Sequence, residues 1–373
     1  MLIQYSYFNI RYSNINRMKL SSFPIKERGT KCPFVRLLDM KKKERMKIYT
    51  LLFGILFVSP TQAQTMHDWE NHHVLQINRE PARAAFTPFS VQKGDGSISL
   101  DGTWKFRWTP VPNERVMNFY QTNFNDKDWT DFPVPANWEV NGYGTPIYVS
   151  AGYPFKIDPP RVMGEPKTDY TTYKERNPVG QYRRTFVLPA GWEANGQTFL
   201  RFEGVMSAFY VWINGKRVGY SQGSMEPSEF NVTKYLKSGE NQISLEVYRY
   251  SDGSYLEDQD FWRFGGIHRS IHLIHTPDIH VRDYAVRTLP ASAGDYEDFI
   301  LQIDPQFSVY RGMTGKGYVL QGVLKDASGK EVATLKGNVE DILDLEHKAS
   351  RMNEWYPQRG PRKMGRLRSE EHT

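Results

Sequence analysis

One segment, residues 248–269, concentrates the side chains that could do chemistry. It holds four acids, three arginines, three glycines, three tyrosines and a Trp. Carboxylates accept hydrogen bonds from sugar hydroxyls or hold a cation that does so, and aromatic faces cover the apolar side of a pyranose. The same composition also fits an acidic loop pinned by ion pairs to Arg263 and Arg269. These residues therefore indicate either a sugar site or a structural loop.

The elements that must position this segment are short β-strands. Trp104, Phe106 and Trp108 alternate with basic residues, which is the period of a strand with one buried face. Long helical periodicity is absent, and Gly/Pro turns and aromatic residues are frequent. The predicted fold class is all-β, with a jelly-roll β-sandwich over residues 64–276.

Two strand features precede the acidic segment. Residues 209–220 are predicted to form a hairpin, in which Asn214 and Gly215 supply the two positive φ angles of a type I′ turn. Ile243, Leu245 and Val247 alternate with Ser, Glu and Tyr, which predicts a strand buried on one face only.

Residues 277–345 are predicted to form an incomplete immunoglobulin-like sandwich. Four strands are expected, at 279–288, 299–307, 318–325 and 331–335, with a turn at 326–329 between the last two. An immunoglobulin-like sandwich needs about seven strands. Residues 346–373 are rich in Arg, Lys, Gly and Pro and are predicted to be an unstructured basic tail.

The net charge of +6 lies at the two ends of the chain. Residues 1–63 carry twelve Lys and Arg against three Asp and Glu, and residues 348–373 carry seven against three. The part between them is therefore net −7. A basic face is what nucleic-acid binding requires, so no nucleic-acid partner is expected.

Residues 40–63 have the order of a secretory signal peptide: a basic start, eleven largely apolar residues from Ile48 to Val58, and small residues before Ala63. A membrane anchor is the alternative, but eleven residues are too few to cross a bilayer. The mature protein is therefore expected to begin at Gln64 and to be exported, to the periplasm or outside the cell.

Residues 1–39 precede a usable signal and are interpreted as an upstream extension from a misplaced start codon. They contain Cys32, the single cysteine of the chain. The mature protein is thus expected to have no disulfide and to rely on core packing for its stability.

Many segments, in order, resemble the amino-terminal half of bacterial β-galactosidases of glycoside hydrolase family two. They include Asp68-Trp-Glu-Asn71, Val134-Pro-Ala-Asn-Trp138, Gly144-Thr-Pro-Ile-Tyr148, Val211-Trp-Ile-Asn-Gly215 and Ser251–Arg263. The resemblance is continuous over residues 67–288 and weaker over residues 289–345.

The resemblance implies a jelly roll, an immunoglobulin-like domain and then a (β/α)₈ barrel that bears two catalytic glutamates. Such an enzyme hydrolyses terminal non-reducing β-D-galactose residues with retention, using carboxylates about 5–5.5 Å apart. This chain stops before a barrel could start, so none of its glutamates is assigned a catalytic role and the chain alone is expected to be inactive. The full-length form is expected to be a homo-oligomer, with magnesium in the barrel.

The resemblance also implies two substrate-binding residues. Asp260 matches the family aspartate that contacts a galactose hydroxyl and a bound sodium ion. Ser150 stands where the family has a sugar-binding Asn, and a hydroxyl cannot reproduce both the donor and the acceptor of an amide. Asp258 is interpreted as structural support rather than as a ligand.

A second function remains open, because jelly rolls also occur as stand-alone carbohydrate-binding modules without catalytic activity. A separate module should have a closed second domain or none. The unfinished second domain predicted here favours an amino-terminal fragment of a β-galactosidase.

Overall fold

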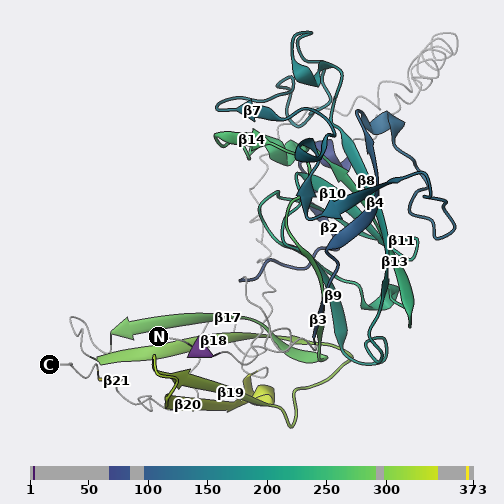
Figure 1. Ribbon diagram of the computed structural model, residues 1–373. Helices are drawn as coiled ribbons and strands as arrows, with labels where there is room; N and C mark the ends of the chain where they lie inside the picture. The colour runs from purple at the N-terminus through teal and green to yellow at the C-terminus, as the bar shows by residue number, and fades with distance from the viewer. Residues whose placement is uncertain (1–2, 5–66, 85–95, 291–297, 343–366, 369–373) are drawn as a thin grey trace, which may run out of the picture. The chain divides into compact units, whose positions relative to one another are not determined.

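The chain folds as two packed β-sheets followed by a smaller pair of sheets (Figure 1). The structure is a computed structural model and describes residues 3–4, 67–84, 96–290, 298–342 and 367–368. The prediction of an all-β fold is confirmed. Short 3₁₀ helices occur between strands, namely η2 (Asp68–Glu70), η3 (Pro112–Glu114), η4 (Glu139–Asn141), η5 (Thr171–Tyr173), η6 (Thr233–Tyr235) and η7 (Asp252–Tyr255).

Residues 76–276 form a jelly-roll-like sandwich of a seven-stranded and a four-stranded sheet. The larger sheet runs in the order β2 (Gln76–Ile77), β11 (Lys216–Gln222), β10 (Ala208–Ile213), β13 (Glu240–Tyr248), β8 (Val179–Val187), β4 (Gly102–Thr109) and β5 (Thr130–Val134). The smaller runs β12 (Ser228–Asn231), β9 (Gln197–Phe202), β16 (Ile271–Thr276) and β3 (Ser97–Ser99).

The core between these sheets is built from large apolar side chains of both. Trp104, Phe106 and Tyr182 from the larger sheet belong to one buried cluster with Leu200 and Phe202 from the smaller. Burying aromatic rings of this size is the main source of stability in a chain that relies on packing.

The prediction that Ile243, Leu245 and Val247 lie on a half-buried strand is wrong. Their strand, β13, is buried on both faces, and Glu246 is only 6% exposed. A second aromatic cluster causes this, because it covers the outer face of the larger sheet; it includes Trp69, Phe155, Tyr210, Tyr220, Tyr248 and Tyr250. Glu246 is satisfied there by hydrogen bonds from Gln181 and Tyr248.

The hairpin prediction at residues 209–220 is confirmed. Strands β10 and β11 pair antiparallel, with Ile213 opposite Lys216. Asn214 has φ +50° and Gly215 φ +77°, which is the pair of left-handed conformations that a type I′ turn requires.

Two short ribbons stand at one end of the sandwich. In one, β7 (Ile147–Val149) pairs with β14 (Phe261–Arg263), and in the other β6 (Ala136–Asn137) pairs with β15 (Gly266–Ile267). Figure 1 shows the β7–β14 ribbon beyond the ends of the main sheets. The acidic segment therefore leaves the core at the end of β13 and returns along β14.

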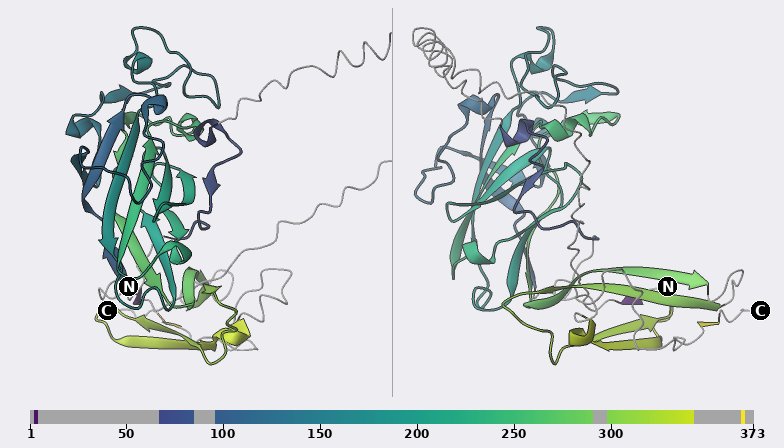
Figure 2. Two further views of the ribbon diagram at one scale, coloured as in Figure 1. Left: turned by 90° about the vertical axis from the view of Figure 1, so that its right-hand side faces the viewer. Right: turned by 180° about the vertical axis from the view of Figure 1, so that it is seen from behind.

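The chain after residue 277 contains the four predicted strands, with ends that differ by up to three residues. They are β17 (Ile279–Pro290), β18 (Asp298–Val309), β19 (Val319–Lys325) and β20 (Glu331–Asn338). Figure 2 shows the β17–β18 and β19–β20 hairpins as two layers, and their side chains share one small core that includes Phe307, Leu320 and Leu324. The predicted turn is present, because Gly329 donates its N–H to the carbonyl of Asp326.

Two further short strands lie in the segments predicted to be the upstream extension and the basic tail. β1 (Ile3–Gln4) pairs with β19, and β21 (Leu367–Arg368) pairs with β18. The predicted signal peptide, Cys32 and most of the predicted extension and tail lie outside the described residues. Within the described ranges, no helix is long and apolar enough to cross a membrane.

Candidate functional site

The β7–β14 ribbon brings the two predicted substrate-binding residues together. Phe261 pairs with Val149 in the antiparallel register, so one step further along the ribbon places Asp260 beside Ser150. Nothing in the sequence requires residues more than 100 positions apart to pair. The structure thus joins two segments that only the family resemblance had linked.

The outer face of the ribbon also carries two exposed aromatic side chains. Tyr148 lies opposite Trp262 in the register, and their rings make an edge-to-face contact with centroids 5.6 Å apart. Tyr148 is 51% exposed and Trp262 is 47% exposed. Because side chains two positions apart point to the same side of a strand, these rings flank Asp260 and Ser150.

Asp260 is exposed and makes no ion pair with any residue that the structure describes. Its Oδ1 accepts a hydrogen bond from the hydroxyl of Tyr148. That bond raises the pKa of Tyr148 above its ordinary value, because ionising the phenol would place two negative charges together. One carboxylate oxygen, Oδ2, receives no hydrogen bond from the described residues.

The alternative of an ion pair at Asp260 is not what the structure shows. Arg263 pairs with Asp258 instead, at 2.7 Å, and also donates to the carbonyl oxygen of Glu257. Arg269 donates to the carbonyl oxygens of Glu203 and Met225. Asp258 therefore holds the loop, as a structural support would.

Ser150 is exposed, and its hydroxyl makes no hydrogen bond to the residues that the structure describes. A free hydroxyl beside Asp260 can donate one hydrogen bond to a ligand and accept another. It lacks the second donor that an amide would place at this position.

A buried ion pair anchors the ribbon to the sandwich. Arg249, at the end of β13, lies 3.2 Å from Glu139, and both side chains are 1% exposed. The guanidinium donates to the carbonyl oxygen of Thr145, before β7, and to that of Arg263, in β14. One cation thus ties both strands of the ribbon to the core.

Glu139 completes this anchor. Its carboxylate accepts the backbone N–H of Gly265, directly after β14. Burial raises the pKa of Glu139, and the neighbouring Arg249 opposes that rise. The pair fixes the position of the ribbon without contacting its outer face.

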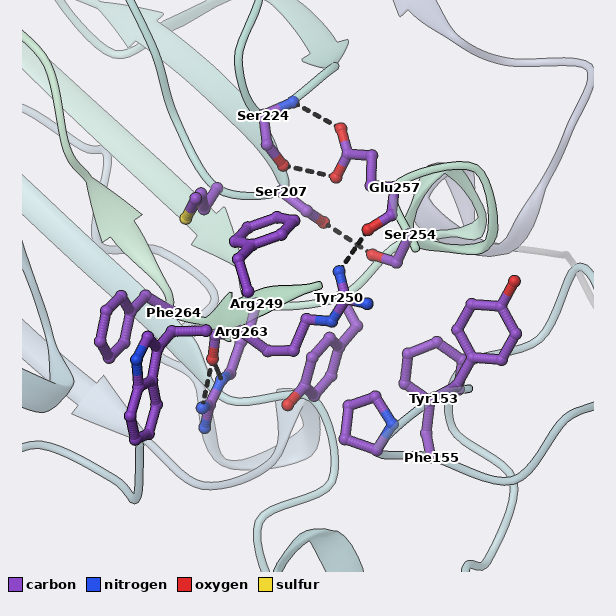
Figure 3. A pocket seen from close by; sticks show the side chains of 14 residues that line it. Tyr153, Phe155, Ser207, Ser224, Arg249, Tyr250, Ser254, Glu257, Arg263 and Phe264 are labelled. Carbon is purple, nitrogen blue, oxygen red and sulfur yellow. Dashed lines mark hydrogen bonds between the residues drawn. The ribbon is translucent and has the colours of Figure 1, made fainter. Parts of the chain in front are cut away.

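A small cavity lies against β14 (Figure 3). Its lining combines aromatic and polar side chains, including Tyr153, Phe155, Ser224, Tyr250, Glu257, Phe261 and Arg263. Glu257 accepts hydrogen bonds from the N–H and the hydroxyl of Ser224. Trp262 also lines this cavity, but Asp260 and Ser150 do not.

Sequence reasoning missed Tyr148, Trp262, Arg249 and Glu139. The two aromatic residues could have been found from their spacing, since each lies two positions from a predicted site residue. The buried pair carried no such signal, because Glu139 and Arg249 lie far apart in the sequence and become partners only in the fold.

Comparison with known proteins identifies the class. Residues 98–277 match the family described as glycosyl hydrolases family 2, sugar binding domain. A calcium binding mutant of Bacteroides uniformis β-glucuronidase 2 has a similar fold, with a TM-score of 0.50 and 23% identity, covering 65% of this chain and 26% of that one. Residues 98–277 therefore carry the sugar binding domain of the glycosyl hydrolases of family 2.

Within that family, the chain corresponds to the amino-terminal part of β-galactosidases. It is 38% identical over 279 residues to the β-galactosidase of Priestia megaterium, covering 71% of this chain and 26% of the relative. It is 41% identical over 238 residues to that of Yersinia pestis, covering 62% and 21%. The chain thus spans about a fifth to a quarter of the length of these curated relatives.

Proposed function

We propose that this chain supplies one wall of the galactose subsite of a β-galactosidase whose catalytic barrel lies beyond it. The observation that carries the proposal is the exposed Asp260 carboxylate, which has no ion-pair partner among the described residues and which lies, like Ser150, one position beyond the Phe261–Val149 pair. The similarity to β-galactosidases supports the choice of substrate.

In this proposal the chain binds and orients the sugar, and the barrel provides the chemistry. Oδ2 of Asp260 accepts a hydrogen bond from a galactose hydroxyl, and Ser150 contributes one further donor or acceptor. Such charge-assisted bonds align the glycosidic bond with groups that this chain does not contain. The buried Arg249–Glu139 pair holds the ribbon, and therefore Asp260, in place.

Asp260 also fits part of a sodium site. A hard monovalent cation prefers oxygen ligands, and Asp260 offers an anionic oxygen to which no described residue donates. Among the described residues, no group of three or more His, Cys, Asp or Glu could hold a metal ion. Asp260 would therefore share a sodium ion with oxygen ligands from the sugar or the barrel, and the ion would supply positive charge to orient a sugar oxygen.

The test is to extend the gene through the frame that follows Thr373 and to assay the longer protein. We expect release of nitrophenol from a β-galactoside and not from a β-glucuronide, and no release by the 373-residue chain. Hydrolysis by the 373-residue chain itself, or a clear preference for the glucuronide, would contradict the proposal. A stop codon directly after Thr373 in every frame would instead favour a binding module.

A further inference from the structure

We propose that Tyr148 is a positioning residue, whose hydroxyl holds Asp260 in the orientation that receives the sugar. The proposal rests on the proposed function, because it assigns a role within the same subsite. It concerns the outer face of the β7–β14 ribbon, where Tyr148, Trp262 and Asp260 lie together.

The hydrogen bond from Tyr148 to Oδ1 is the one hydrogen bond that the described residues make with the Asp260 carboxylate. An exposed aspartate without other contacts samples several rotamers. A donor on Oδ1 selects one of them and leaves Oδ2 for a ligand. Tyr148 reaches this position because it lies on β7, two residues before Ser150, and thus on the same side of the ribbon.

Contacts with neighbouring aromatic rings also hold the ring of Tyr148. Trp262 meets it edge to face, and the Trp262 ring in turn stacks on Phe264, with centroids 5.8 Å apart and an angle of 4° between the planes. These contacts restrict the tyrosine although half of its surface is exposed. A tyrosine whose ring is already restrained loses less side-chain entropy on forming the hydrogen bond than a mobile tyrosine does, and it therefore holds the carboxylate more firmly.

A purely structural role would require Tyr148 to contribute to the core. The opposite is observed, because Tyr148 and Asp260 are both exposed, Tyr148 on a two-stranded ribbon and Asp260 directly before its second strand. A hydrogen bond between exposed groups adds little to the free energy of unfolding. Its effect should therefore be seen in ligand binding rather than in stability.

The first arm of the test needs only the 373-residue chain. The pKa of Tyr148, followed by NMR of its ring carbon, should lie above the ordinary tyrosine value and should fall when Asp260→Ala removes the acceptor. An unchanged pKa of Tyr148 in the Asp260→Ala variant would overturn the proposal, whatever the substrate is.

The second arm uses the longer protein with its barrel. Tyr148→Phe removes the hydroxyl and keeps the ring, and we expect kcat/KM for a β-galactoside to fall about three- to tenfold, as for the loss of one hydrogen bond. The same substitution in an Asp260→Ala background should cause no further loss, because the bond is already absent. The matched control is Tyr143→Phe, which loses a 2.9 Å hydroxyl contact to Thr130 away from the ribbon and should leave kcat/KM unchanged.

The outcomes separate this proposal from the proposed function. If Asp260→Ala lowers kcat/KM and Tyr148→Phe does not, the positioning role is wrong while the subsite stands. If Tyr148→Phe lowers kcat/KM equally with and without Asp260, Tyr148 acts directly and the positioning role is again wrong. If neither variant alters kcat/KM although the pKa of Tyr148 responds to Asp260, the subsite itself is wrong and the positioning role falls with it.

Discussion

Asp258 and Asp260 show how two similar side chains acquire different roles at the scale of single residues. Asp258 is paired with Arg263 at 2.7 Å and accepts the N–H of Gly152, so its oxygens are used within the loop. Among the described residues, only the hydroxyl of Tyr148 donates a hydrogen bond to Asp260, and the Asp260 side chain is exposed. The available carboxylate is the one that the family resemblance had assigned to the sugar.

Ser150→Asn tests the neighbouring position. The amide restores a second polar group beside Asp260, and one additional hydrogen bond to a neutral group contributes about 0.5–1.5 kcal/mol. In the longer protein we expect KM for a β-galactoside to fall about two- to tenfold, measured by steady-state kinetics. A KM that does not change would place Ser150 outside the subsite, and the control Ser328→Asn, in the β19–β20 turn, should leave KM as it is.

Sequence reasoning reached the site only in part. Asp260 and Ser150 were proposed from the resemblance, but their proximity depends on the pairing of β7 with β14. That pairing is not encoded in the local pattern of either segment, because three-residue strands carry too little periodicity. Tyr148 and Trp262 could have been found, since each lies two positions from a predicted site residue.

At the scale of the elements, sequence patterns predicted where strands occur better than they predicted which faces of those strands are buried. The Asn214-Gly215 turn and the four strands after residue 277 follow from local preferences and are present. The half-buried reading of β13 failed, since its polar face is covered by aromatic side chains from distant parts of the chain. Which face of a strand is buried depends on what else packs there.

Breaking the buried Arg249–Glu139 ion pair should strongly destabilise the protein. Arg249→Ala leaves Glu139 as an unpaired buried carboxylate, which typically destabilises a protein by about 3–5 kcal/mol. We expect a loss of this size in the free energy of unfolding, measured with urea, together with faster amide exchange at β7 and β14. Lys105→Ala, which breaks an exposed pair with Asp131, should cost less than about 1 kcal/mol, and an equally small loss for Arg249→Ala would refute the anchor.

His280, at the start of β17, should make stability depend on pH. Its Nδ1 donates to the carbonyl oxygen of Pro277 at 2.8 Å, and burial lowers its pKa to about 4. The unfolded chain, with an ordinary pKa near 6.5, binds a proton first as the pH falls. Stability should therefore decrease from pH 6.5 towards pH 4, by up to about 3 kcal/mol from this group.

The measurement is urea unfolding at pH 7.5, 5.5 and 4 for the chain and for His280→Gln. The variant should be less stable at pH 7.5 but should lose less stability on acidification. His268, whose pKa burial also lowers to about 4, remains in both proteins and should leave a residual dependence. An identical pH dependence in the two proteins would show that His280 is not the responsible group.

At the scale of the whole molecule, the chain matches about a fifth to a quarter of the length of the β-galactosidase relatives. The β-galactosidase relatives are about four to five times its matched length and the jelly roll offers a wall of a site rather than an enclosed pocket. The charge distribution does not favour nucleic-acid binding, because the positive charge lies at the ends and the region between is net negative. A fold alone does not define an activity, so the assignment rests on the site residues.

Export is a separate proposal about the whole molecule. The basic, apolar and small-residue order of residues 40–63 predicts cleavage after Ala63. In a bacterial host we expect the mature protein outside the cytoplasm, with an amino terminus at Gln64 by mass spectrometry. Exported protein that retains residues before Ala63 would contradict the cleavage site, and a Leu52→Arg variant, which interrupts the apolar run, should stay in the cytoplasm.

The most direct test of the central claim is Asp260→Asn in the longer protein, assayed at two sodium concentrations. The substitution removes the charge and keeps the shape, and losing a charge-assisted bond costs about 1.5–3 kcal/mol. We predict a fall in kcat/KM of about ten- to a hundredfold, weaker activation by sodium and little change in Tm. A lower Tm with an unchanged kcat/KM would show that Asp260 is a structural residue and would contradict the account.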